Sequence, residues 1–276
     1  MPVIDSHHHF WRFNEQDYGW IDPAQTALRR DFLPADLARE IQAAGIDGVV
    51  SIQARQSLEE TDWLLHLGRE HAFIHGVVGW VPLAEPDVGE TLARLSASAP
   101  KLRGVRHVLQ GEPDGYMLAE AFNLGLTRLA PLNLAYDLLV FERQLPQAIA
   151  LVDRHPSQVF VLDHLAKPRI AAGEREPWAR HLRDLARRPN VFCKISGMVT
   201  EADRAAWSES QLRPYFDHVL TSFGPSRLMF GSDWPVCLDA CDYARWRHIV
   251  GRWIGQLTED EQARILGGTA IEAYRL

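Results

Sequence analysis

The stretch VFVLDHL, residues 159–165, contains the pattern that decides the fold of this 276-residue chain. Four apolar residues run without interruption, and Asp163 and His164 follow at once. A short and nearly continuous apolar run is typical of a parallel strand that is buried on both faces of its sheet. We therefore interpret this stretch as a buried strand with reactive groups at its carboxyl end.

The same pattern recurs seven more times along the chain. The other runs are VID (3–5), VVSIQ (49–53), IHGVVGWV (74–81), LRGVRHVL (102–109), LNLAYDLLV (132–140), VFCKISG (191–197) and RLMFGSD (227–233). Segments with helical spacing of apolar residues lie between several of them, at 34–45, 59–71 and 176–188, and a last one lies near 258–266. Eight strands alternating with helices over ~250 residues predict a single α/β domain, a (β/α)8 TIM barrel spanning residues 1–276, with an open doubly wound sheet as the rival.

The bulk composition favours an ordinary globular enzyme. The chain is 46% hydrophobic and 24% charged, with a formal net charge of −7 at pH 7. An acidic chain lacks the basic face that binding of nucleic acid requires, and no run of about 18 apolar residues predicts a membrane span. No glycine-rich nucleotide-binding motif follows a strand. We expect a small-molecule substrate, while the sequence gives no indication of the oligomeric state.

The cysteines and the amino terminus bear on the compartment. Cys193, Cys237 and Cys241 are odd in number and lack paired spacing, which favours a reducing environment. The first residues, MPVIDSHHHFW, have neither a basic region nor a long apolar stretch. We therefore expect a cytoplasmic protein without disulfides.

Polar side chains gather at the predicted carboxyl ends of the strands, which share one mouth in a barrel. His7 and His9 follow the first run and point to the same side because side chains alternate along an extended segment. The apolar part of the sixth run ends at Asp163-His164, and the eighth run ends in Asp233, next to the first in a closed barrel. Together they predict a site for a divalent cation, with Asp233 as ligand, as base for water, or as both. The alternatives are a polar amino-terminal arm or tag remnant, a hydrogen-bonded core histidine, and a turn at Asp233.

Further residues of the predicted mouth are candidates for catalysis or substrate binding. Arg106 and Lys194 are cations in apolar strands, where an unpaired charge is costly to bury. Each either pairs with a carboxylate or stabilises an oxyanion and grips the substrate. Asp137 and Asp163 are candidates for orienting the histidines. The residues predicted to contact substrate are Trp11, Gln53, Tyr136 and Trp234.

The ordered set of residues resembles the amidohydrolase superfamily, and in particular its sugar-lactone hydrolase branch of L-fuconolactonase- and L-rhamnonolactonase-like proteins. The resemblance extends over essentially the whole chain. It is carried by the segments IDSHHHFW (4–11), GVRH (104–107), YD (136–137), LDHL (162–165), KISG (194–197) and GSDWP (231–235).

The resemblance implies hydrolysis of an ester or amide at a ring carbonyl, with a sugar 1,4- or 1,5-lactone as the substrate and Asp233 as the proton acceptor. His164, Arg106 and Lys194 are the other expected catalytic residues. Many relatives carry a histidine after strand five and a bridging lysine or glutamate after strand four, where this chain has Tyr136-Asp137 and Arg106-His107. This departure leaves at most one divalent metal, for which zinc is favoured, at His7, His9, His164 and Asp233.

Two functions of other kinds remain open at this stage. A metal-dependent decarboxylase acting on a small unsaturated acid would use the same ligands on the same scaffold. A barrel that binds sugars without catalysis would need the pocket and not the base.

Overall fold

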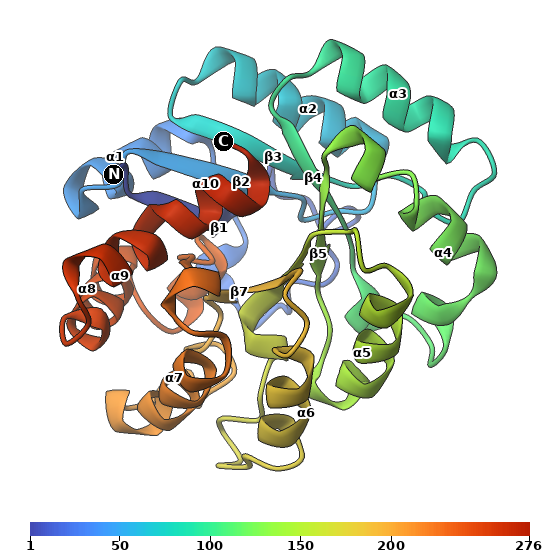
Figure 1. Ribbon diagram of the computed structural model, residues 1–276. Helices are drawn as coiled ribbons and strands as arrows, with labels where there is room; N and C mark the ends of the chain where they lie inside the picture. Colours follow the sequence, from blue (N-terminus) through green and yellow to red (C-terminus); the bar gives the residue numbers. More distant parts are fainter.

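The computed structural model describes all residues from 1 to 276 and places eight parallel strands in one sheet, in sequence order. The strands are β1 (Ile4–His8), β2 (Gly48–Ile52), β3 (Ile74–Gly79), β4 (Leu102–His107), β5 (Ala135–Leu138), β6 (Phe160–Leu162), β7 (Val191–Ile195) and β8 (Leu228–Phe230). A bridge between His8 and Trp234 joins the two ends, and the Asp233 amide donates to the His7 carbonyl over 2.8 Å. The predicted (β/α)8 barrel is confirmed (Figure 1).

Helices surround the ring of strands (Figure 1). They are α1 (Pro34–Ala44), α2 (Leu58–Glu70), α3 (Val88–Ser98), α4 (Glu120–Leu126), α5 (Leu145–Arg154), α6 (Trp178–Leu185), α7 (Glu209–Phe223), α8 (Tyr243–Ile254), α9 (Glu259–Ala263) and α10 (Thr269–Tyr274). Helix α1 begins with a proline, whose φ suits a first turn, and ends at Gly45 in the left-handed conformation, with φ 66°. The segment predicted near 258–266 is instead α9 followed by a single π turn, Arg264–Gly268.

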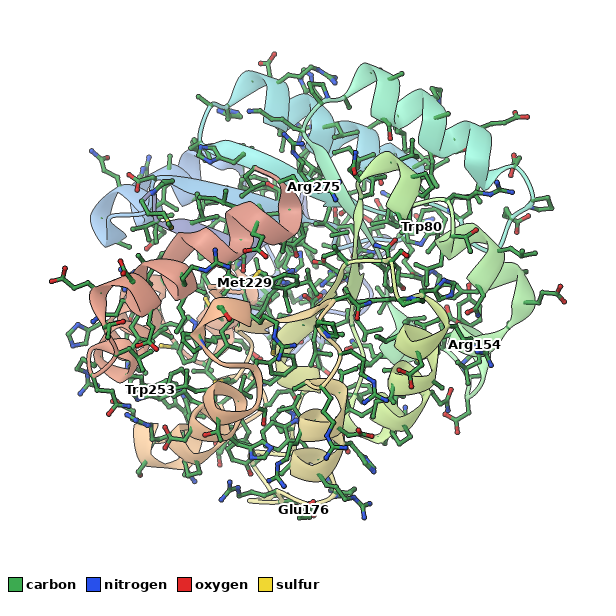
Figure 2. All side chains as sticks on the ribbon, viewed as in Figure 1. Trp80, Arg154, Glu176, Met229, Trp253 and Arg275 are labelled. Atoms are coloured by element: carbon green, nitrogen blue, oxygen red, sulfur yellow. The ribbon has the colours of Figure 1, made fainter.

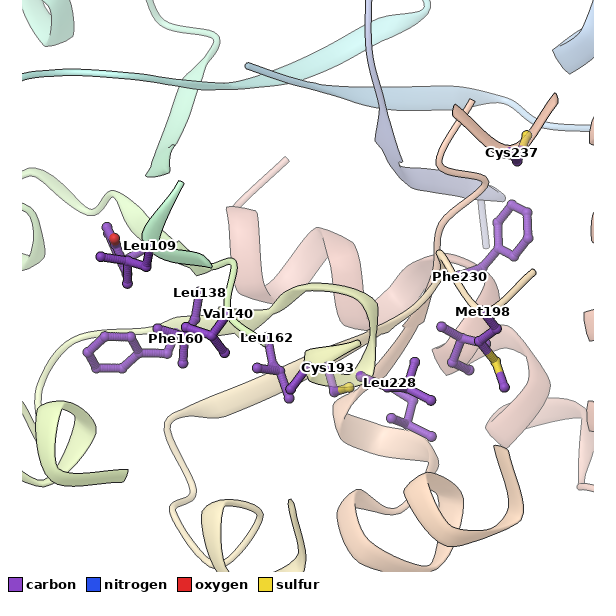
Figure 3. Packing of buried hydrophobic residues seen from close by; sticks show 14 of the residues in the cluster. Leu109, Leu138, Val140, Phe160, Leu162, Cys193, Met198, Leu228, Phe230 and Cys237 are labelled. Carbon is purple, nitrogen blue, oxygen red and sulfur yellow. The ribbon is translucent and has the colours of Figure 1, made fainter. Parts of the chain in front are cut away.

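Two apolar cores result from the alternation of side chains along the strands. The larger core, 69 buried residues, includes strand side chains that point away from the barrel axis, such as Leu138, Phe160 and Leu162 (Figure 3). The smaller core has 11 buried residues, among them Met229 near the middle of the ring in Figure 2, and includes Tyr274 from α10. Since these strand residues point inward, α10 closes the amino-terminal end of the barrel. The opposite end contains buried polar groups, and the site lies there.

No helix of the chain is both long enough and apolar enough to cross a lipid bilayer.

Candidate active site

Four predicted residues from three separate parts of the chain meet at the carboxyl end of the barrel. His7 Nε2 and His9 Nε2 lie 3.1 Å apart. Asp233 Oδ1 lies 3.6 Å from His7 Nε2 and 3.5 Å from His9 Nε2. It also lies 3.9 Å from His164 Nε2. All four side chains are buried, so three imidazole nitrogens face one carboxylate oxygen where little water competes.

Each histidine is fixed through its other ring nitrogen. His9 Nδ1 lies 2.9 Å from the Ile52 carbonyl, which can only accept, so this nitrogen carries the proton and His9 Nε2 presents its lone pair. His164 Nδ1 lies 2.8 Å from Ser196 Oγ. His7 Nδ1 lies beside Lys194 and Asp163. The Nε2 atoms are therefore the nitrogens that remain for chemistry.

The backbone around His164 and Asp233 adopts a conformation that side chains rarely permit. The four residues from His164 to Lys167 all have φ between 49° and 59°, and Asp233 has φ 59°. Such conformations cost roughly 1–3 kcal/mol each and persist where the surroundings impose them, commonly at functional sites. Gly197 is required next to them: it has φ 66°, and a Cβ there would lie 2.6 Å from His164 Nδ1.

Burial and proximity set the charge states of the site. Burial alone would raise the pKa of Asp233, but the neighbouring His164 and His9 lower it below its ordinary value of 3.8. Burial lowers the pKa of His164 to about 4 and also lowers the pKa of His9 and, more strongly, of His7. At neutral pH the site thus combines an ionised carboxylate with neutral imidazoles.

These donors fit one divalent cation. The ligand atoms of His7, His164 and Asp233 lie within 4.8 Å of one another, and His9 Nε2 adjoins them. Neutral imidazole nitrogens and a carboxylate oxygen are the ligands that zinc takes in catalytic sites. The adjacent carboxylates, Asp137 and Asp163, are ion-paired with Lys194 instead.

Arg106 and Lys194 both form the ion pairs that one sequence alternative expected, but they lie in different places. Arg106 donates to Asp163 Oδ2 over 2.9 Å and to the Gln53 backbone carbonyl, and it also lines the cavity above the histidines. Its Nε is buried and has no partner in the protein. Lys194 is fully buried, pairs with Asp137 and Asp163, and does not reach the cavity.

A cavity of about 320 Å³ opens above the histidine cluster. Its lining combines apolar side chains with charged and hydroxyl groups: His9, Trp20, Gln25, Ala54, Arg106, Val108, Gln110, Leu139, His164, Lys167, Thr200, Glu201, Arg204, Asp233 and Val236. Trp20, Lys167, Glu201 and Arg204 were not predicted as site residues. They lie in loops, where no periodic pattern marks a residue as facing a site.

Four residues predicted to contact substrate do not line this cavity, which corrects that expectation. Trp11 is buried against Phe32 and donates through Nε1 to the Arg30 carbonyl, and Trp234 also packs on Phe32. Tyr136 precedes the inward-pointing Asp137, so it points outward and packs between Phe122 and Phe160. Gln53 is fully buried, and its side-chain oxygen accepts from Arg106 over 2.9 Å.

Comparison with known proteins places the chain among hydrolases. A family model described as amidohydrolase matches residues 4–276. An L-fucono-1,5-lactonase of Burkholderia multivorans is 42% identical over 285 aligned positions, which cover 99% of this chain and 96% of that protein. An L-fucono-1,5-lactonase of Burkholderia ambifaria is 37% identical, with 99% and 95% covered.

Solved crystal structures support the same family assignment. The crystal structure of an amidohydrolase from Burkholderia multivorans with bound zinc superposes with a TM-score of 0.95 at 41% identity, covering 100% of both chains. A second crystal form of an amidohydrolase from that organism, with bound HEPES, gives a TM-score of 0.96.

Proposed function

This chain belongs to the amidohydrolase family, and from that premise we propose that it hydrolyses a sugar lactone to the aldonic acid, with L-fucono-1,5-lactone as the leading substrate. The observation that carries the proposal is the Asp233 carboxylate, which faces the Nε2 atoms of three histidines at the floor of a cavity of about 320 Å³. A cavity of that volume is suited to a single sugar ring.

Asp233 acts as the base in the proposed reaction. Its lowered pKa keeps it ionised at neutral pH, so it takes a proton from a water molecule as the water oxygen attacks the lactone carbonyl carbon. The carbonyl π electrons move onto oxygen and give a tetrahedral intermediate. When the carbonyl re-forms, the bond to the ring oxygen breaks, and Asp233 returns the proton to that oxygen. One water is consumed and one hydroxy acid is formed.

Arg106 is the proposed donor to the oxyanion. Its guanidinium is held by Asp163 and Gln53, and its side chain lines the cavity. A fixed cation that needs no reorganisation during the reaction typically contributes ~10²–10³-fold to the rate. His164 adds a second polar contact, because Ser196 engages its Nδ1 while its Nε2 faces the reaction centre.

His7, His9, His164 and Asp233 are the residues that would hold a divalent cation, and we propose zinc. When bound there, zinc would polarise the lactone carbonyl and lower the pKa of water. Asp233 and Arg106 do not depend on the metal for their positions. We therefore expect chelation to reduce the rate without abolishing it.

The test is acid release in a pH-stat from a panel of aldonolactones, with chelator-treated enzyme and with zinc-reloaded enzyme. We expect one equivalent of acid per lactone and the highest kcat/KM for L-fucono-1,5-lactone. If no lactone is hydrolysed in either state, the proposal is wrong. Carbon dioxide release from an unsaturated acid would instead identify a decarboxylase, and lactone binding without turnover would identify a sugar-binding barrel.

We also propose a cytoplasmic location. All three cysteines are free and buried, as expected of a protein folded in a reducing compartment.

A further inference from the structure

His7 has two competing partners at the same ring nitrogen. Its Nδ1 lies 3.2 Å from Lys194 Nζ, which can only donate, and 3.3 Å from Asp163 Oδ1, which as a carboxylate can only accept. A neutral imidazole carries its single proton on one nitrogen. His7 therefore accepts from Lys194 or donates to Asp163, and it does not do both at once.

The two hydrogen-bonding arrangements at His7 Nδ1 leave His7 Nε2 in different protonation states. His9 Nε2 presents a lone pair because its Nδ1 donates to Ile52, and it lies 3.1 Å from His7 Nε2. If Lys194 donates to His7 Nδ1, the His7 proton is on Nε2 and donates to His9. If His7 donates to Asp163, two lone pairs face each other across 3.1 Å and repel each other, and a cation bound between them would remove this repulsion.

We propose that Lys194 and Asp163 make His7 a two-state ligand, in which Lys194 stabilises the metal-free site and Asp163 stabilises the metal-bound site. The inference rests on the proposed metal site. Lys194 is then a positioning residue that acts through His7 and never touches substrate. Because it stabilises the metal-free form, it weakens metal binding and keeps the site ordered when the metal is absent.

The surroundings of Lys194 fit this role. The ammonium is fully buried, pairs with Asp137, and lies 2.9 Å from Asp163 Oδ1. The Tyr274 hydroxyl of α10 lies 2.8 Å from both Asp137 oxygens and anchors the pair from the amino-terminal end of the barrel. Asp163 Oδ1 is buried without a well-aligned hydrogen-bond donor, as expected of an acceptor that His7 uses in only one state.

The decisive variant is Lys194→Met combined with Asp137→Asn. It removes one positive and one negative charge, so the net charge of the chain is unchanged, and it leaves Asp163 paired with Arg106. We expect zinc to bind about tenfold more tightly, within the range in which residues behind the ligands tune metal affinity. Competition with a chromophoric chelator measures the affinity. We also expect the metal-free rate to fall relative to the zinc-loaded rate.

The matched control is Arg188→Met with Asp153→Asn, which removes an ion pair on the outside of the barrel, Arg188 Nε to Asp153 Oδ1 at 2.9 Å. We expect zinc affinity to be unchanged in this control. If the Lys194 and Asp137 double variant does not fold, Tyr274→Phe serves instead. It frees Asp137 to draw Lys194 away from His7, and we expect two- to fivefold tighter zinc.

A spectroscopic readout tests the two states directly. In ¹⁵N-histidine NMR of the wild-type protein, we expect His7 to carry its proton on Nε2 without metal and on Nδ1 with zinc. A proton on Nδ1 in both states, or a folded double variant with unchanged or weaker zinc affinity, would overturn the inference. Failure of the wild type to hydrolyse any lactone would overturn the proposed function and leave these measurements intact.

Discussion

The histidines at the carboxyl ends of the strands form two groups, His107 alone on β4 and the mouth histidines His7, His9 and His164. The two groups differ in which atoms their ring nitrogens contact. His107, at the end of β4, accepts from Trp80 Nε1 through Nδ1 over 3.2 Å and contacts Glu112 Oε1 through Nε2 over 2.8 Å. It also stacks on Tyr116, with ring centroids 5.1 Å apart. At the mouth, His9 and His164 each use one nitrogen for the protein and point the other at Asp233.

This difference shows what separates a structural histidine from a reactive one in this barrel. Both groups are buried, and burial lowers the pKa of His107 as it lowers those at the mouth. Strand position and charge state therefore do not distinguish them. What distinguishes them is a ring nitrogen that the protein turns toward Asp233 at the mouth.

The largest effect is expected at Asp233, the carboxylate that the histidine nitrogens of the mouth face. Asp233→Asn keeps the shape of the side chain and removes the base, so kcat should fall ~10²–10⁴-fold. Initial rates on the best lactone measure this, and circular dichroism checks the fold. Near-normal turnover would remove Asp233 from the mechanism and with it the contrast between the two groups.

The second prediction applies the same substitution, histidine to glutamine, to one histidine of each group. His9→Gln removes a nitrogen that faces Asp233, so zinc affinity and kcat/KM should each fall about 10–100-fold. His107→Gln should leave both within threefold and instead lower the free energy of unfolding by roughly 1–3 kcal/mol, because buried partners lose their hydrogen bonds. Chemical denaturation and chelator competition measure the pair. Equal loss of activity in both variants would show that His107 is needed for the reaction as much as His9 is.

A smaller effect is expected at the cavity wall. Trp20 is 47% exposed, lines the cavity, and packs edge-on against Trp11. Packing of its face on sugar C–H groups is worth about 1 kcal/mol, so Trp20→Ala should raise KM about fivefold with kcat within twofold.

The matched control for Trp20 is Leu124→Ala. Leu124 is 57% exposed on α4, the helix whose Phe122 packs on His107, and it does not line the cavity. Its substitution should leave KM unchanged. An unchanged KM for Trp20→Ala as well would place the sugar elsewhere in the cavity.

The smallest effect concerns pH. The proposed base must be ionised, so activity is present above its pKa and is lost as pH falls through it. The pKa of Asp233 is lowered, and His164 stays neutral down to about pH 4. We therefore expect kcat to change less than about twofold between pH 7 and pH 5, with the loss at lower pH. A tenfold fall per pH unit beginning near 6.5 would indicate a histidine with an ordinary pKa in the rate-limiting step.

The strands of the barrel could be predicted because a strand buried on both faces is a short, nearly continuous run of apolar residues in the sequence. All eight apolar runs overlap a strand, although the run at 132–140 is a strand only over Ala135–Leu138. His7, His9, His164 and Asp233 could be predicted because each follows or ends such a run. The loop residues Lys167 and Glu201, which form an ion pair of 3.7 Å at the cavity wall, could not, because loops have no periodicity that reports their facing.

The aromatic residues show why residue type alone is insufficient. Trp11, Tyr136 and Trp234 have side chains suited to sugars, yet each is packed against other aromatic rings away from the cavity. A one-residue difference in strand position reverses the direction of a side chain, as Tyr136 and Asp137 demonstrate.

The amino-acid sequence by itself determined the alternation of buried strands and helices and the set of reactive groups at the strand ends, because both depend on the local order of apolar and polar residues. Only the tertiary structure decided which nitrogens are free, which cations are neutralised and which aromatic rings reach the cavity. Those properties depend on partners distant in the chain, such as Lys194 beside His7 and Tyr274 beside Asp137, and hydrogen bonds between them exist only once the barrel has closed.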